Sequence, residues 1–201
     1  MTTTPMVITK HSITCSTMKT EGSTNKESII QALSATGRQG IENVLAELEN
    51  NGFYEAPGSV KYHSNYRGGL AEHSLAVYQC AMELKEKNPN SYGSLSEDSI
   101  AITGLLHDLC KADVYFMKAD GTPGRSMRKF PIGHGEKSVI MLLRLGLALT
   151  EEEMLAIRWH MGKHTFQERS VDRENFDAAL KSPAKALIEL IQRADGMAAK
   201  A

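Results

Sequence analysis

Long hydrophobic runs are missing from this sequence, which excludes a membrane-spanning helix, because such a helix takes about 18 or more consecutive apolar residues. The N-terminal residues also lack the apolar segment of a secretory signal peptide. Charge of one sign is not in excess either, since 23 Lys and Arg oppose 24 Asp and Glu. A globally basic field for non-specific nucleic-acid binding is therefore excluded, although a local basic patch is not.

Cysteine is scarce as well. The three cysteines, Cys15, Cys80 and Cys110, form no Cys-x-x-Cys pair and do not indicate the disulfide framework of a small secreted protein. Their number and spacing suit a reducing cytosol, so we expect a cytoplasmic protein that does not contact a membrane. The chain of 201 residues, of which 41% are hydrophobic, is long enough for one domain with a real core, or for one domain with a tail.

Residues 1–24 are rich in Ser and Thr and show little periodicity, which predicts a disordered N-terminal tail. The alternative is that the segment from Ile8 to Ile13 forms a short strand or an arm in a homo-oligomer. Helical patterning begins near Lys26. We therefore predict one helical domain over residues 25–201.

Apolar periodicity, capping residues and glycine stops place the helices of this domain. The predicted helices run from near Lys26 to Gly37, from Ile41 to Asn51, from about Leu70 to Asn88, from a Ser94–Glu97 capping box through His107, from His134 to Gly146, from a Thr150–Glu153 capping box to Gly162, from Phe176 to Leu180, and from Pro183 onward. One β-hairpin interrupts them, with strands over Val114–Met117 and Met127–Ile132 and a turn at Asp120–Gly124. The predicted class is therefore all-α, with one hairpin insertion.

The most informative stretch ends an apolar run with the dipeptide His107-Asp108. With Ile100, Gly104 and Lys111, this pair follows the spacing of one helix face. An imidazole, a carboxylate and an ammonium on an apolar face are costly unless they have partners. A divalent metal would satisfy two of these groups, and a phosphate bound to that metal would satisfy the third. The alternative is a buried hydrogen-bonded pair of His107 with Asp108.

Further imidazoles and carboxylates lie on helices whose faces are otherwise apolar, or at a helix N-terminus. Together with the central dipeptide they make six candidate metal ligands: His73, His107, Asp108, His134, His160 and Asp195. A set of imidazoles and carboxylates without thiolates suits Mn²⁺, Fe²⁺, Zn²⁺, Ni²⁺ or Mg²⁺. Six ligands exceed the three protein ligands of a catalytic zinc, whereas two divalent metal ions bridged by a carboxylate would use all six.

Five short motifs carry these candidates: Gly68-Gly69-Leu70-Ala71-Glu72-His73, Leu105-Leu106-His107-Asp108-Leu109-Cys110-Lys111, Gly133-His134-Gly135-Glu136, Ile157-Arg158-Trp159-His160-Met161-Gly162 and Arg193-Ala194-Asp195. As an ordered set they resemble the HD-domain superfamily of metal-dependent phosphohydrolases, and in particular its dinuclear branch. Within that branch the chain is similar to the HD domain of bacterial 3′–5′ exoribonucleases and to small HD-type dinucleoside-polyphosphate hydrolases.

The resemblance implies an HD-type helical bundle in which His73, His107, Asp108 and Asp195 hold one metal, and His134 and His160 hold a second, with Asp108 bridging. It also implies hydrolysis of a phosphoester or phosphoanhydride of a nucleotide or related small molecule through a metal-bridging hydroxide. One alternative is a phosphodiesterase or 3′–5′ exonuclease that acts on short single-stranded nucleic acid. Another is a non-catalytic, metal-stabilised nucleotide-binding module.

Cationic side chains near these motifs are the candidates for substrate contacts. Lys111 lies one turn beyond the His-Asp pair, where it is expected to stabilise charge on a non-bridging phosphate oxygen during catalysis. Arg125, Arg128 and Lys129 cluster on the returning half of the hairpin and are expected to bind the non-reacting phosphates or backbone of the substrate.

Three further residues near the expected site each have two alternative assignments from sequence. Arg158 precedes the Trp159-His160 pair and binds either phosphate or an acidic neighbour such as Glu153 or Glu72. His63 and His164 flank the site in loops, where either could contact substrate, although incidental surface histidines are expected.

Overall fold

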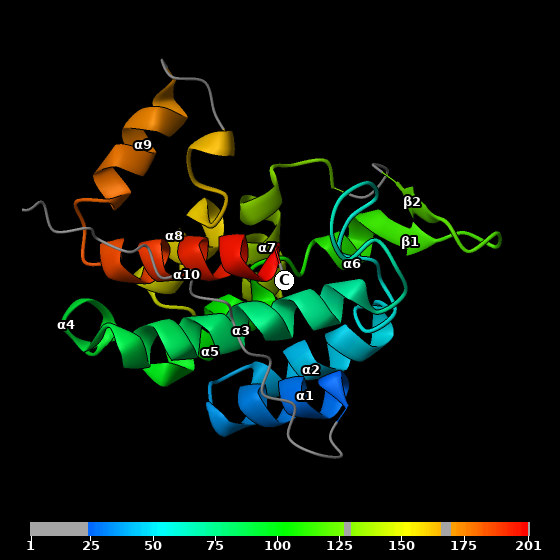
Figure 1. The fold of residues 1–201 in the computed structure, drawn as a ribbon, viewed down its shortest axis with the longest axis horizontal. Helices are drawn as coiled ribbons and strands as arrows, with labels where there is room; N and C mark the ends of the chain where they lie inside the picture. The colour runs from blue at the N-terminus through cyan, green and yellow to red at the C-terminus, as the bar shows by residue number, and fades with distance from the viewer. Residues whose placement is uncertain (1–23, 127–129, 166–169, 201) are drawn as a thin grey trace, which may run out of the picture.

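Helix α3, the 19-residue segment Gly69–Lys87, is the central element of the fold. The structure is a computed structural model that describes residues 24–126, 130–165 and 170–200. In Figure 1, α3 crosses the molecule between the α1–α2 pair on one side and α10 on the other. Helix α5 also packs along α3.

Helices account for all of the described elements except one hairpin, which agrees with the predicted all-α class. The helices are α1 (Asn25–Ala35), α2 (Ile41–Asn50), α4 (Pro89–Tyr92), α5 (Glu97–Leu106), α6 (Lys111–Val114), α7 (His134–Arg144), α8 (Glu151–Trp159), the 3₁₀ turn η1 (Gly162–Thr165), α9 (Val171–Ala179) and α10 (Lys185–Ala198). No helix in this part of the chain is long and apolar enough to cross a membrane.

Two apolar clusters hold the helices together. The first lies where α1 and α2 meet α3 and α5 and includes Leu33, Leu48 and Leu105. The second lies between α3, α8 and α10 and includes Val77 and Ile191. These side chains are buried, and burying each one stabilises the fold by about 1.5–3 kcal/mol relative to leaving it exposed.

Helix α5 approaches α3 closely at a glycine. A Cβ atom at Gly104 would lie 3.0 Å from the Cα atom of Tyr78 in α3, which is closer than carbon atoms normally pack. The small residue therefore lets the C-terminal end of α5 lie directly against α3. This contact brings the end of α5, where the His-Asp pair begins, close to His73.

Capping residues fix several helix starts. The predicted capping box of Thr150 with Glu153 at α8 is confirmed, and Thr24 with Glu27 forms a second one at α1. Thr24 is therefore not part of the predicted N-terminal tail, whose other residues lie outside the described part of the chain. The predicted box at Ser94 is wrong, because the N-cap of α5 is Ser96 and its side chain makes no capping bond.

The hairpin forms, but it returns earlier than predicted. Strand β1 (Tyr115–Met117) pairs antiparallel with β2 (Pro123–Arg125), and Tyr115 faces Arg125. The turn is tightened because Oδ1 of Asp120 accepts hydrogen bonds from both the backbone N–H and the hydroxyl of Thr122. The predicted second strand over 127–132 is therefore wrong for residues 130–132, while 127–129 lie outside the described residues.

Two helices near the C-terminus also differ from their predicted bounds. Helix α9 spans Val171–Ala179 and is longer than the predicted segment. Helix α10 begins at Lys185, so Pro183 precedes the helix instead of occupying its first turn. Neither difference moves Asp195, which lies in the last turn of α10.

Candidate metal centre

The His-Asp pair lies in a turn between two helices. Helix α5 ends at Leu106 with His107 as its C-cap, and α6 begins at Lys111. The prediction that His107, Asp108 and Lys111 share a face of one continuous helix is therefore wrong. They are nevertheless neighbours, because Nζ of Lys111 lies 2.6 Å from Oδ2 of Asp108.

Asp108 is the centre of the cluster and is almost completely buried. Its Oδ2 atom lies 3.2 Å from Nε2 of His107 and 3.9 Å from Nε2 of His73. Its Oδ1 atom lies 2.6 Å from Nε2 of His134 and 3.6 Å from Nε2 of His160. The two carboxylate oxygens thus divide the four imidazoles into two pairs.

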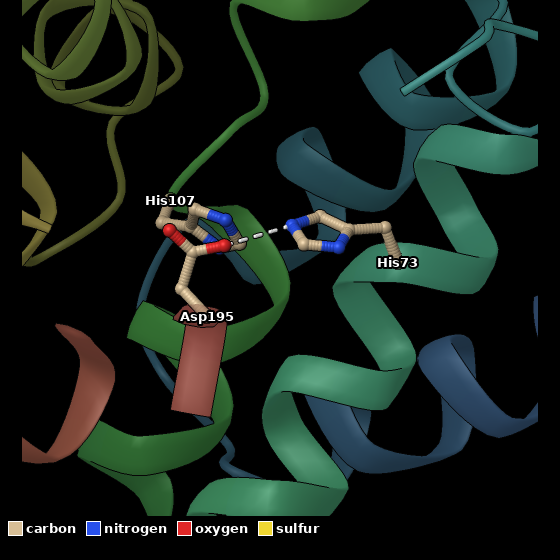
Figure 2. A group of neighbouring side chains, drawn as sticks. All are labelled: His73, His107 and Asp195. Atoms are coloured by element: carbon tan, nitrogen blue, oxygen red, sulfur yellow. Dashed lines mark ion pairs between the residues drawn. The ribbon is translucent and has the colours of Figure 1, made fainter. Parts of the chain in front are cut away.

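Asp195 adds a second carboxylate beside the Oδ2 pair. Figure 2 shows that His73 from α3 and Asp195 from α10 point toward one another, with His107 at the end of α5 next to them. Oδ1 of Asp195 lies 3.1 Å from Nε2 of His73. The candidate ligand atoms of His73, His107 and Asp195 all lie within 4.8 Å of one another, as do those of His107, Asp108 and His160.

Helix ends orient two of the histidines in the same way. His107 and His160 are the C-caps of α5 and α8, and each ring directs Nδ1 to the carbonyl three residues earlier. These distances are 2.9 Å to Gly104 O and 2.7 Å to Ile157 O. A carbonyl acceptor requires the proton on Nδ1, so when the ring is neutral the lone pair is on Nε2, the nitrogen that faces Asp108. Histidines that bind metals are commonly oriented by such a contact.

Several buried polar atoms of the cluster make ion-pair contacts or none, but no well-formed hydrogen bond. They are both ring nitrogens of His73, Nε2 of His107, Nε2 of His160 and Oδ1 of Asp108. Each buried polar atom left without a partner costs about 1–3 kcal/mol. These nitrogen and oxygen atoms lie close together and point into a shared space, but they form poor hydrogen bonds with one another. A divalent ion in that space would give these nitrogen and oxygen donors a partner, so the residues fit a metal centre.

The two carboxylates are held ionised. Burial alone would raise the pKa of Asp108, but Lys111 and the neighbouring imidazoles hold it well below its usual range. Burial would likewise raise the pKa of Asp195, but contact with His73 lowers it to about 2. Both side chains therefore present negative charge to the shared space.

The histidines differ in charge. Burial and the neighbouring His107 imidazole lower the pKa of His160 to about 3, so its ring is neutral and able to bind a metal. Burial would also lower the pKa of His134, but the Asp108 carboxylate raises it to about 10. The same carboxylate raises the pKa of His107 against the effect of burial. Without a metal ion, a proton on His134 therefore neutralises part of the charge on Asp108.

A pocket of about 220 Å³ opens beside the cluster, and its cationic lining includes Lys111 and His134. Arg125 of β2 lines the same pocket, so the structure brings one of the three predicted hairpin cations to the site. Lys137, which sequence reasoning did not single out, lines it too and lies 3.1 Å from Asp113. The predictions for Arg128 and Lys129 fall outside the described residues.

Arg158 has acidic neighbours other than those proposed from sequence. Its guanidinium lies 2.6 Å from Glu136 and 3.5 Å from Asp172, and it stacks 3.8 Å from the ring of Trp159. Glu153 instead pairs with Arg38.

His63 lies beside the cluster, although sequence reasoning treated it as incidental. Its ring centroid is 5.0 Å from that of His73, and burial and the His73 ring lower its pKa. Loop conformation depends on hydrogen bonds that leave no periodic pattern, and the sequence offered only the loop glycines Gly58, Gly68 and Gly69 as a sign of tight turns before α3. The side chain of His164 is not among those that the structure describes.

Comparison with known proteins adds two matches. The model of the HD domain family matches residues 70–200, a segment that contains all six candidate ligands. The dihydroneopterin 2′,3′-cyclic phosphate phosphodiesterase of Methanocaldococcus jannaschii is 39% identical over 69 residues, which are 34% of this chain and 28% of that protein. The chain therefore covers little more than a quarter of that relative. No solved structure matches the chain.

Proposed function

This chain belongs to the HD-domain family, and on that premise we propose that it is a divalent-metal-dependent phosphohydrolase that acts on a nucleotide or a related small phosphoester. The observation that carries the proposal is the division of ligands around Asp108. One oxygen faces His73 and His107, and the other faces His134 and His160. A carboxylate with imidazoles on both of its oxygens is arranged to bridge two cations.

The family binds divalent metal ions, and we propose two of them here. His73, His107, Asp108 and Asp195 would hold one ion, while His134 and His160 would hold the other with Asp108 between them. When bound, such ions supply positive charge at a phosphate group and lower the pKa of a nearby water molecule. Mn²⁺, Fe²⁺, Zn²⁺, Ni²⁺ and Mg²⁺ all suit this donor set.

The chain's own cations prepare the site for phosphate. Lys111 reaches Asp108 from the pocket side, and its pKa is raised by that carboxylate against the effect of burial. Its ammonium is therefore charged and can donate to a non-bridging phosphate oxygen, where it would stabilise the negative charge that grows as the P–O bond breaks. Arg125, across the same pocket, would bind a more distant anionic group of the substrate. Arg128 and Lys129 are proposed for the same role.

Arg158 is a weaker candidate for substrate binding. Its guanidinium is already engaged by Glu136 and Asp172, so a phosphate would have to share it with these carboxylates. We therefore propose that Arg158 chiefly joins α7, α8 and α9 beside the site.

A small phosphodiester is a specific candidate substrate. The relative from Methanocaldococcus jannaschii is named for hydrolysis of a 2′,3′-cyclic phosphate, which is a phosphodiester of a small molecule. That activity supports a diester as substrate, and it keeps the alternative of a phosphodiesterase or 3′–5′ exonuclease on short oligonucleotides in consideration. A cytoplasmic location and a homo-oligomeric state stay predictions from sequence.

A hydrolysis screen tests the proposal. The panel contains 2′,3′-cyclic nucleotides, nucleoside diphosphates, dinucleoside polyphosphates and short single-stranded RNA, each with one of the five metals. We expect hydrolysis of at least one class, lost on chelation and restored by the metal. Protein that retains its metal ions yet cleaves no member of the panel would favour the non-catalytic nucleotide-binding module instead.

A further inference from the structure

His63 extends the row of imidazoles beyond the candidate ligands. Ring centroids are 4.8 Å apart for His107 and His160, and 5.6 Å apart for His73 and His107. His63 follows at 5.0 Å from His73, on the far side of the row from His134. Unlike His73, it has an exposed side chain. A ligand bound at the cluster can therefore reach its ring.

Hydrogen bonds hold the backbone of His63 in place. The hydroxyl of Ser59 donates to the carbonyl of His63 at 2.7 Å, and the Ser59 hydroxyl oxygen accepts from the N–H of Tyr62 at 3.0 Å. The N–H of Gly58 donates to the carbonyl of Ser64 at 2.7 Å. An exposed histidine on a loop is usually free to move, but this one has its backbone fixed on both sides.

The next residue adopts a costly backbone conformation. Ser64 has a φ of 57°, in the left-handed region that residues other than glycine rarely adopt. Gly69 accommodates this geometry, because a Cβ atom there would collide with the carbonyl of Ser64. Strain of this kind costs about 1–3 kcal/mol and often occurs where a residue must be held for binding or catalysis.

His63 is positioned beside the candidate ligands but does not join them. Among the described residues, neither group of converging ligand atoms includes His63. The residue also precedes the segment that matches the HD domain family, which begins at residue 70. Its imidazole nevertheless lies close enough to Asp108, Lys111 and Asp195 to interact with them electrostatically. It is therefore suited to contact what the centre binds.

We propose that His63 is a substrate-binding residue that donates a hydrogen bond from its ring N–H to an oxygen of the phosphate group bound at the centre. This inference rests on the proposed phosphohydrolase function and deepens it. Lys111 and Arg125 meet the substrate from the pocket beside His134, whereas His63 meets it from the His73 end of the row. Together they define a site in which the phosphate is held from both ends of the metal centre.

Binding of inorganic phosphate to the Mn²⁺-loaded protein tests this without relying on catalysis. The variants are His63→Ala, His63→Gln, whose amide N–H can still donate, and Asn65→Ala, a matched change of an exposed residue on the same loop. Calorimetry should show that His63→Ala weakens phosphate binding about tenfold or more, because a hydrogen bond to a charged group is lost. We expect His63→Gln to recover part of that loss and Asn65→Ala to bind as wild type.

Metal content and kinetics separate this role from others. Elemental analysis should find the same manganese content in His63→Ala as in wild type, and a lower content would make His63 a ligand. Unchanged phosphate affinity in His63→Ala, an equal loss in Asn65→Ala, or no phosphate binding by the loaded wild type would each overturn the inference. If the wild type hydrolyses no phosphoester but His63→Ala still weakens phosphate binding, the proposed reaction fails while this contact stands.

Discussion

The part of the centre next to Oδ2 of Asp108 lies within packed helices, whereas the part next to Oδ1 reaches the surface. The first side, which we call the His73 side, consists of His73 in α3, His107 at the end of α5 and Asp195 in α10. The second side, which we call the His134 side, consists of His134 and His160. The side chains of His73 and His160 are each 1% exposed and that of Asp195 is 16% exposed, but that of His134 is 32% exposed, so the second side reaches the surface through His134.

This difference follows from the elements that carry the residues. The helices of the His73 side pack on one another through the apolar core, so its ligand positions are formed before any ion binds. His134 is the first residue of α7 and directly follows the connection from the hairpin. In the metal-free protein it also carries a proton, which a second ion must displace. We therefore expect tight binding of one ion on the His73 side and weaker, exchangeable binding on the His134 side.

Removing the shared carboxylate should abolish the difference between the sides. Asp108→Asn takes one negative charge from both and should lower the content of both ions. Because bound metal contributes several kcal/mol to transition-state stabilisation, kcat/KM should fall by about a thousandfold or more. Elemental analysis and kinetics measure the two effects. Asp98→Asn, an exposed carboxylate at the other end of α5, is the matched control and should change neither. Loss of only one ion in Asp108→Asn would exclude the bridging role.

Removing one ligand from each side should expose the difference directly. His134→Ala should retain close to one ion per chain, because the His73 side stays intact, and His160→Ala should behave in the same way. His73→Ala should lose the tightly held ion. Since each variant lacks a complete centre, each should lose about a hundredfold or more in kcat/KM. Elemental analysis after dialysis distinguishes them, with circular dichroism as the control for folding. Equal retention in His73→Ala and His134→Ala would mean that burial does not set the affinity.

The sequence carried enough information to find both sides but not their boundary. His107 and Asp108 were recognisable because they end an apolar run, and Asp195 because it lies on an apolar helix face. The segment from Ile100 to Lys111 contains no proline, and its one glycine, Gly104, lies inside α5 and not at its end. Apolar periodicity therefore predicted a helix that continues past Leu106. Only the folded structure shows that α5 ends at Leu106 and that the residues from His107 to Cys110 form a turn.

Elements outside regular helices were predicted less well. The sequence predicted a returning strand over Met127–Ile132, but the turn at Asp120 sets the register and makes Pro123–Arg125 the pairing strand. The sequence favoured an incidental role for His63 over a substrate contact, because its position depends on hydrogen bonds within a loop and on the left-handed conformation of Ser64. Neither feature has a periodic signature in sequence.

Lys111 tests whether charge stabilisation depends on the metal ions alone. It contacts Oδ2 of Asp108 and also lines the pocket beside His134, without being a candidate ligand. Lys111→Ala should therefore leave the metal content near that of wild type and lower kcat by about a hundredfold, because a charged donor to the transition state is lost. Lys111→Arg keeps the charge and should recover part of the rate. If the kinetics of Lys111→Ala match those of wild type, this lysine serves only to neutralise Asp108.

Arg125 should show the smallest effect, confined to the His134 side. It lines the pocket beside His134 and is expected to bind an anionic group away from the reacting phosphorus. Such a contact acts about equally in the ground and transition states, so Arg125→Ala should raise KM about three-fold to five-fold with little change in kcat. Lys118→Ala, which removes an exposed cation at the turn of the same hairpin, is the control.

The increase in KM should be larger for a dinucleoside polyphosphate or an oligonucleotide than for a monophosphate, since only the longer substrates extend to the pocket. The double change Arg128→Ala with Lys129→Ala should follow the same pattern. An equal effect on short and long substrates would place the Arg125 contact at the reacting phosphate itself, and no effect on either would remove the hairpin from substrate binding.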